Sequence, residues 1–175
     1  VRLLRGLRPK VMVMENVSGM VKGKMKLIFA EIIQELKASG YRVKCQLMNA
    51  KYFHVPQSRQ RLISIGVRDD LEIEPSFPKV ESKPICGMCA CEGIIDNFPN
   101  PFGHRGFNLS ERYLKHCLPS PTILANALVP GSDMPFFTKT ARIGDNRIKV
   151  ISSFPLSFLV GGGFARCAKL IGNSV

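Results

Sequence analysis

Apolar residues at different spacings divide the N-terminal part of the chain into strands and a helix. Residues 11–14 form a short continuous apolar run, which predicts a strand covered on both faces, as in a parallel sheet. Over residues 22–39 apolar positions recur every three or four residues, which predicts an amphipathic helix. Alternation over residues 41–48, and again over 61–67, predicts two further strands. This order indicates the later part of an open α/β sheet.

The remainder of the chain lacks such periodicity. Residues 69–145 are rich in Pro, Gly, Asn and Cys and contain no periodic stretch of ten residues. We expect a small irregular or β-rich lobe there, with one short helix near residues 110–117, where Ser110 can cap the first turn. Residues 146–175 combine a Phe-Pro turn at 154–155 with three consecutive glycines at 161–163.

The charge balance suggests a polyanionic partner. Lys and Arg number 25 against 13 Asp and Glu, a net charge of +12. Such an excess favours nucleic acid or an anionic membrane surface, although a basic protein without either partner is the plain alternative. No apolar run reaches the roughly 18 residues that cross a bilayer. We therefore expect nucleic acid as the partner and no membrane.

Three of the six cysteines form a cluster: Cys86, Cys89 and Cys91. A Cys-x-x-Cys spacing can begin a zinc site, but a closed structural site needs four ligands. His104, His116 and Cys117 could supply a fourth, yet none has a recognisable spacing. We expect no bound metal, and a zinc-dependent nucleic-acid module remains a minor alternative.

Two groups of polar residues follow or precede the predicted strands. Glu15 and Asn16 come directly after the run at 11–14, and ligands of open α/β sheets bind beyond the carboxyl ends of strands. The alternative is that Asn16 or Ser18 caps the next helix. In an extended chain Gln57, Arg59 and Arg61 share one face, and two guanidinium forks suit phosphate or a base carbonyl. The alternative there is a solvated basic strand end.

Together these segments resemble the DNA cytosine-5 methyltransferases. The resemblance rests on Glu15-Asn16-Val17 after a strand, on Pro56-Gln57-Ser58-Arg59-Gln60-Arg61 before another, and on the terminal Gly172-Asn173-Ser174-Val175. It implies an α/β fold: the second half of a Rossmann-like S-adenosylmethionine-dependent methyltransferase sheet, with a small irregular or β-rich target-recognition lobe. Residues 1–68 would belong to the catalytic domain, 69–145 to target recognition, and 146–175 would return to the catalytic domain.

The resemblance also implies catalytic roles. Glu15 would engage N3 of a flipped-out cytosine, so that a cysteine thiolate attacks C6 and C5 accepts a methyl group. Asn16 would hold the local loop, Arg61 would neutralise charge at the cytosine O2, and Arg59 would organise the pocket.

The same resemblance implies binding residues. Double-stranded DNA would contact Gln57, Arg59 and Arg105, and Asn173, Ser174 and Val175 would line the pocket of the methyl donor, S-adenosyl-L-methionine. An enzyme of this kind would be cytoplasmic in a bacterium and nuclear in a eukaryote.

Several features of that family are missing. No Pro is followed by Cys, the dipeptide that carries the nucleophile, and there is no Phe-x-Gly-x-Gly turn for the cofactor. The glycines at 161–163 do not replace that turn, because we do not expect them both to follow a strand and to open a helix. The helix that the family has before its Phe-Pro turn is expected to be shortened or missing at 147–152.

We therefore expect the latter half of an enzyme. Such a chain would be inactive alone, and it would associate, precipitate or require a complementary N-terminal half or subunit because its first strand lacks a neighbour. The alternative is a non-catalytic DNA-binding or regulatory relative that partners a complete methyltransferase.

Overall fold

The computed structural model describes residues 1–81, 83–97, 114–115, 117–125 and 143–174. The chain divides into two compact units, each of which takes in two stretches of sequence. Unit 1 comprises residues 1–49 and 60–79, and unit 2 comprises residues 50–59 and 80–175. Within the described part of the chain, no helix combines the length and apolarity that crossing a membrane requires.

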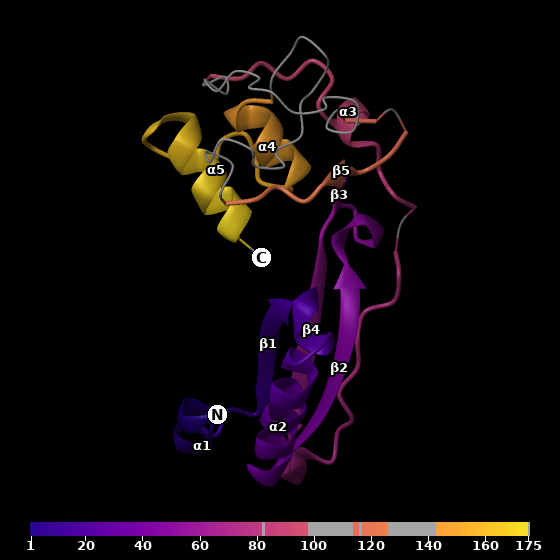
Figure 1. Ribbon diagram of the computed structural model, residues 1–175, viewed down its shortest axis with the longest axis vertical. Helices are drawn as coiled ribbons and strands as arrows, with labels where there is room; N and C mark the ends of the chain where they lie inside the picture. Colours follow the sequence, from indigo (N-terminus) through magenta and orange to yellow (C-terminus); the bar gives the residue numbers. More distant parts are fainter. Residues whose placement is uncertain (82, 98–113, 116, 126–142, 175) are drawn as a thin grey trace. The chain divides into compact units, whose positions relative to one another are not determined.

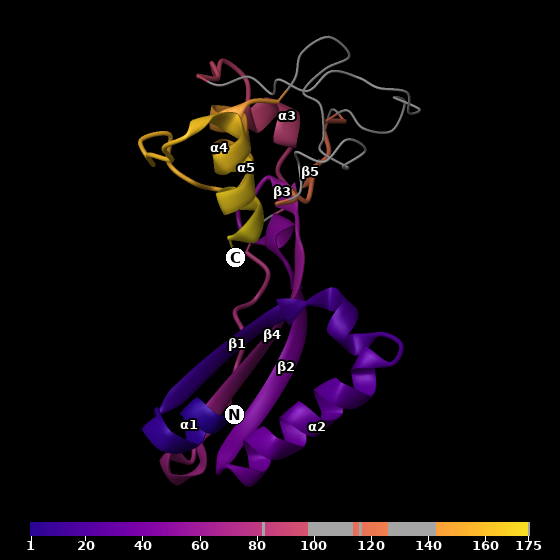
Figure 2. The same cartoon turned by 60° about the vertical axis from the view of Figure 1, so that its left-hand side comes forward.

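Unit 1 is a three-stranded sheet with a helix on one face (Figures 1 and 2). The central strand of the sheet is antiparallel to both neighbours. Leu36 of the helix and Tyr41 and Leu62 of the sheet are at most 3% exposed. The elements are α1 (Arg2–Leu7), β1 (Val11–Val17), η1 (Ser18–Val21), α2 (Met25–Ala38), β2 (Tyr41–Asn49), β4 (Gln60–Arg68) and η3 (Asp69–Leu71), with the strand order β1-β4-β2.

The expectation that residues 11–14 form a parallel strand covered on both faces was wrong. Among the described residues β1 pairs with β4 alone, and the pairing is antiparallel. β4 lies between β1 and β2 and runs antiparallel to both. Val11, Val13 and Val17 are 52%, 68% and 53% exposed, so the β1 face that carries them is open.

Unit 2 is built around two helices that pack against each other, α4 (Asp145–Ile151) and α5 (Gly163–Asn173). Its other elements are η2 (Ala50–Tyr52), the short helix α3 (Gly87–Ala90) and the parallel strands β3 (Gln57–Ser58) and β5 (Ser120–Pro121). The core consists of apolar residues that are at most 4% exposed: Cys91, Leu114, Ile123, Ile143, Ile148, Ile151, Phe164, Cys167, Ala168 and Ile171.

Helix α4 shows that the helix expected to be shortened or missing at 147–152 is present, over Asp145–Ile151. Ile148 and Ile151 are fully buried, so the helix has a covered apolar side. The Asp96 carboxylate accepts hydrogen bonds from the backbone amides of Gly144 (3.1 Å) and Arg147 (2.9 Å). A carboxylate at the start of a helix satisfies free amides and complements the helix dipole. Asp96 lies about 50 residues upstream, so no local pattern could have predicted this cap.

The glycines at 161–163 open a helix. Gly162 and Gly163 have φ values of 96° and 75°, a region that residues with a side chain rarely adopt, and α5 begins at Gly163. No strand precedes them in the described structure, as expected. The short helix expected near 110–117 falls largely on residues outside the described part, and the expected domain limits at 68 and 145 remain predictions.

Candidate functional site

Glu15 and Arg61 come together on the sheet of unit 1. Glu15 lies opposite Ile63 and Val17 lies opposite Arg61, so Glu15 and Arg61 are diagonal neighbours on one face. The Arg61 Nε donates to Glu15 Oε1 at 2.6 Å, and the two side chains are 22% and 27% exposed. Arg61 Nη1 also donates to the backbone oxygen of Gln60 at 2.8 Å. Arg61 is therefore held by two contacts, and part of the pair still reaches solvent.

The surroundings of this pair are apolar and open. Strand alternation places Val11, Val13 and Val17 on the same face as Glu15, and all three are more than half exposed. Glu15 lies inside β1, whereas we expected it just after the strand. A carboxylate and a guanidinium on an apolar platform can together contact a flat, polar-edged ring through its edge and its face.

Asn16 fixes the backbone where β1 ends. Its side-chain oxygen accepts a hydrogen bond from the amide of Val17 at 2.8 Å. The alternative role, helix capping, is not observed: η1 has Val17 as its N-cap and α2 has Lys24, and neither has a side-chain cap.

Gln57 is a buried connector in unit 2. It is 2% exposed, and its Nε2 donates to Ser152 Oγ at 3.0 Å and to the backbone oxygen of Ile151 at 3.5 Å. Its Oε1 accepts from the amide of Ile123 at 3.4 Å. One side chain therefore joins β3 to the end of α4 and to the segment after β5.

Arg59 binds backbone carbonyls. Its Nη2 donates to the oxygens of Gly172 (3.1 Å) and Ser174 (2.6 Å), and its Nη1 donates to the oxygen of Ile123 (3.3 Å). The last carbonyls of a helix lack partners within the helix and carry partial negative charge, so a guanidinium is a favourable partner there. Arg59 thus joins the segment between β3 and β4 to the end of α5 and to the segment after β5.

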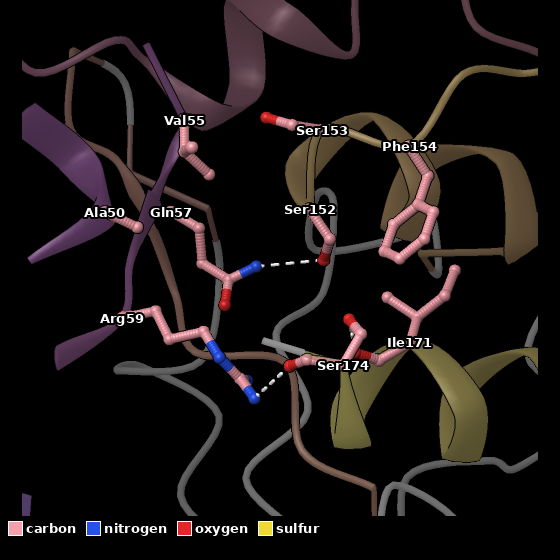
Figure 3. Close-up of a pocket in the computed structure, with 9 residues that line it drawn as sticks. All are labelled: Ala50, Val55, Gln57, Arg59, Ser152, Ser153, Phe154, Ile171 and Ser174. Carbon is pink, nitrogen blue, oxygen red and sulfur yellow. Dashed lines mark hydrogen bonds between the residues drawn. The ribbon is translucent and has the colours of Figure 1, made fainter. Parts of the chain in front are cut away.

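These residues line a cleft of about 350 Å³ within unit 2 (Figure 3). In Figure 3 Gln57 and Arg59 extend from one wall toward Ser152 and Ser174 on the other. The full lining is Ala50, Val55, Gln57, Arg59, Ser152, Ser153, Phe154, Ile171 and Ser174. Sequence reasoning missed Ser152 and Ile171; a stripe of Phe164, Cys167, Ala168 and Ile171 could have revealed α5, but nothing local marks Ser152.

Gln57, Arg59 and Arg61, which would share one face in an extended chain, do not belong to a single strand. Gln57 belongs to β3, which pairs with β5, and Arg61 belongs to β4, which pairs with β1 and β2. Arg59 lies between these strands and belongs to unit 2, whereas Arg61 belongs to unit 1. The two guanidiniums therefore hold different partners.

The remaining expected residues lie at the C-terminus or outside the described part. Asn173 ends α5 with an exposed side chain, and the Ser174 hydroxyl donates to the oxygen of Ile171 at 2.6 Å. Adding a Cβ to Gly172 would bring it within 2.3 Å of the Ala125 amide nitrogen, so the end of α5 needs glycine to pack there. Arg105 and Val175 are outside the described residues.

The cysteine cluster does not form a metal site in the described part of the chain, where no group of three or more His, Cys, Asp or Glu residues is arranged to hold an ion. Cys91 is fully buried in the core, and its Sγ lies 3.8 Å from the backbone oxygen of Arg147. Burial raises the pKa of this thiol to about 12. His104 and His116 lie outside the described residues.

Comparison with known proteins identifies relatives over the first two thirds of the chain. A family model described as C-5 cytosine-specific DNA methylase matches residues 1–114. The chain is 38% identical over 108 residues to the type II methyltransferase M.BspRI of Lysinibacillus sphaericus, covering 58% of this chain and 26% of that protein. It is 39% identical over 79 residues to the type II methyltransferase M.NgoPII of Neisseria gonorrhoeae, covering 45% and 23%. The chain spans about a quarter or less of these curated relatives.

Solved structures share the fold over almost the whole chain. A protein described as a DNA modification methyltransferase, encoded within an E. coli prophage, aligns with a TM-score of 0.72 at 18% identity, covering 99% of this chain and 67% of that one. The Dnmt2 methyltransferase of S. pombe aligns with a TM-score of 0.66 at 15% identity, covering 95% and 62%. The expected α/β methyltransferase fold class is confirmed.

Proposed function

The chain belongs to the C-5 cytosine-specific DNA methylase family, and from that premise we propose that it supplies the base-recognition half of a DNA cytosine-5 methyltransferase. The complete enzyme would transfer a methyl group from S-adenosyl-L-methionine to C5 of a cytosine flipped out of double-stranded DNA. The observation that carries the proposal is the Glu15–Arg61 pair, which joins the two motif strands β1 and β4 at 2.6 Å.

The pair matches the polar edge of cytosine. Glu15 would share a proton with the ring nitrogen N3, and Arg61 would donate to the neighbouring carbonyl oxygen O2. Withdrawal of electrons at these two atoms makes C6 electrophilic, so that a thiolate can add there and C5 becomes nucleophilic. Because Arg61 holds Glu15 Oε1, we assign the other carboxylate oxygen, Oε2, to the base.

Arg59 and Gln57 support the site by positioning. The three carbonyls that Arg59 binds lie in two distant segments, and Gln57 joins β3 to α4. These contacts favour a structural role for both side chains over direct contact with DNA. Their contact with DNA, and that of Arg105, remain predictions.

The residues proposed to bind the methyl donor could form only the rim of its pocket. Asn173 has an exposed amide, which can bind a carboxylate or a ribose hydroxyl, and Ser174 lines the cleft of unit 2. S-adenosyl-L-methionine supplies an electrophilic methyl group when it is bound. The glycine turn that cradles it in the family is absent from this sequence, so this chain would complete a cofactor site that another segment begins.

A complementary N-terminal segment is therefore the proposed protein partner. It would carry the Pro-Cys nucleophile and the glycine turn, neither of which occurs in these 175 residues. The edge of β1 and its open face of Val11, Val13 and Val17 offer a surface for such a segment. A free strand edge with apolar side chains readily pairs with another strand.

DNA binding by the assembled protein should depend steeply on salt. The net charge of +12 provides the cations that neutralise phosphates. Release of counterions makes the logarithm of affinity fall linearly with the logarithm of salt concentration. A fluorescence-anisotropy titration at several salt concentrations measures that slope, and a salt-independent affinity would contradict a phosphate-binding role.

The proposal is tested by complementation. This chain is combined with the part of M.BspRI that precedes the matched segment, and incorporation of labelled methyl groups into mixed-sequence DNA is measured. We expect methyl transfer from the mixture and none from either part alone. No transfer from a mixture that co-purifies as a stable complex would contradict the proposal.

The same assay distinguishes the base-recognition role from the regulatory alternative. That alternative is considered because the nucleophile and glycine-turn motifs are missing. A regulatory relative would stimulate complete M.BspRI without restoring activity to its N-terminal part. The base-recognition role predicts the reverse result.

A further inference from the structure

Two cysteine thiols and a third nearby cysteine meet at the start of α3 in unit 2. Cys86 is the N-cap of α3, and its Sγ accepts from the amide of Cys89 at 3.4 Å and from the amide of Cys117 at 3.1 Å. Cys89 and Cys117 are exposed, and Cys86 is half-buried. The sequence alone grouped Cys86 and Cys89 with Cys91, but Cys91 is buried in the core, and Cys117 takes its place.

The backbone at Cys117 is held in an unusual conformation that serves this contact. Its φ is 64°, in the left-handed region that residues other than glycine seldom adopt. This turn aims the Cys117 amide at Cys86 Sγ. A sulfur that accepts two backbone amides is the setting that stabilises a thiolate over a thiol.

The surroundings of Cys86 and Cys89 shift the pKa values of the two thiols in opposite directions. Partial burial opposes ionisation of Cys86, but hydrogen bonds from the Cys89 amide, the Cys89 thiol and the Cys117 amide outweigh it and lower its pKa. The bond that Cys89 gives to Cys86, together with desolvation, raises the pKa of Cys89. Of the two thiols, Cys86 therefore ionises more readily than Cys89.

We propose that Cys86 and Cys89 form a redox-active dithiol that small-molecule disulfides oxidise to an intramolecular disulfide. The Cys86 thiolate attacks one sulfur of a disulfide RSSR, which forms a Cys86–SR bond and releases RS⁻. The Cys89 thiol then loses its proton to solvent, and its sulfur attacks Cys86 Sγ and expels the second RS⁻. Two protein sulfurs are oxidised, and one RSSR is reduced to two thiols.

The dithiol lies against the strand pair that carries Gln57. The Gly87 amide donates to the oxygen of Leu118 at 2.9 Å, and a Cβ at Gly87 would come within 2.8 Å of the Ser120 amide nitrogen. Ser120 is in β5, whose partner β3 begins at Gln57. A change of geometry at Cys86–Cys89 would therefore press directly on β5.

The remaining described cysteines provide internal references. Cys45 is exposed in β2 of unit 1, far from this cluster in sequence and in a separate unit. Cys91 and Cys167 are buried in the core, and burial raises the pKa of both thiols. Buried thiols of this kind react slowly with oxidants.

The test exposes the full 175-residue chain to glutathione disulfide, quenches free thiols with iodoacetamide and locates the products by peptide mass spectrometry. We expect a Cys86–Cys89 disulfide, formed about tenfold or more faster than glutathione adds to Cys45. Modification of Cys45 as fast as Cys86 would overturn the proposal. Zinc bound in stoichiometric amount by the purified chain would also overturn it, since the thiols would then be ligands.

Three serine variants identify the partners. Cys89→Ser should trap glutathione on Cys86 as a lasting mixed disulfide, because the resolving thiol is gone. Cys86→Ser should lose the fast reaction. Cys117→Ser is the matched control: it keeps the backbone amide that binds Cys86, so the Cys86–Cys89 disulfide should still form. A disulfide between Cys86 and Cys117 in the unmodified chain would contradict the proposed pair.

Discussion

The two units differ in how completely they bury their own apolar side chains. Unit 2 gathers residues from distant segments, such as Cys91, Ile148 and Phe164, into one core. In unit 1 Leu36, Tyr41 and Leu62 are buried, but the face of β1 that carries Val11, Val13 and Val17 is open. Unit 2 therefore resembles a self-contained fold, whereas unit 1 is a platform that carries the Glu15–Arg61 pair and a surface to be covered.

The largest expected effect contrasts a core side chain with an exposed one. Ile148 is fully buried, so Ile148→Ala should lower the free energy of unfolding by about 2–5 kcal/mol. Val13 is 68% exposed, so Val13→Ala should change it by no more than about 0.5 kcal/mol. Urea unfolding, with hydrogen exchange to distinguish the units, measures both. Equal effects would remove the contrast between the units.

A smaller effect on the free energy of unfolding is expected from replacing Arg59, which links separate segments of unit 2. Arg59→Lys keeps the charge but cannot reach three carbonyls with one ammonium group. We expect a loss of about 2 kcal/mol in the free energy of unfolding of unit 2, measured as above, with faster amide exchange in α5. Arg61→Lys is the matched control, because its ion pair is partly exposed in unit 1. Exchange in α5 that Arg59→Lys leaves unchanged would show that the guanidinium does not hold the C-terminal segment.

The open face of unit 1 should drive self-association of the chain. Val13→Lys places a charge at the centre of that face and should weaken association about tenfold, as expected for the loss of roughly 1.4 kcal/mol of apolar burial. Sedimentation velocity at several concentrations measures it. Leu159→Lys is the control, since Leu159 is 92% exposed in unit 2. A well-behaved monomer at all concentrations would contradict the role of this face.

The smallest effect concerns acid sensitivity of unit 1. A hydrogen bond from Arg68 holds the pKa of Asp70 below its ordinary value of 3.8. A carboxyl with a lowered folded pKa stabilises the fold above its ordinary value, and that contribution is lost as the pH falls through the folded pKa. Asp70→Asn should therefore slightly reduce the loss of free energy of unfolding, the acid limb of the stability profile, as the pH falls below about 4. An unchanged acid limb would contradict the pairing.

Local sequence patterns predicted the elements of unit 1 well. The spacing at 22–39 gave α2, and the alternation at 41–48 and 61–67 gave β2 and β4. The pattern could not reveal that β4 lies between β1 and β2, because apolar spacing reports which faces are buried and does not report strand order or direction. The extent of β1 was also underestimated, since polar Glu15 and Asn16 continue the strand.

The contacts of unit 2 were much harder to predict. Arg59 and Ser174 are 115 residues apart, and Cys86 and Cys117 are 31 apart. Such pairs depend on how whole segments pack, which no local spacing encodes. The Glu15–Arg61 pair was within reach because each residue belongs to a recognisable motif, although only the register of β1 against β4 places them on one face.

The central claim is that Glu15 acts on the target base, and the rate of methyl transfer by the complemented protein tests it most directly. Glu15→Gln is compared with Glu35→Gln, because Glu35 also pairs with an arginine, Arg5, on the surface of unit 1. We predict that Glu15→Gln lowers kcat about a hundredfold or more, while Glu35→Gln leaves it near the unmodified rate. Equal rates for the two variants would contradict the account.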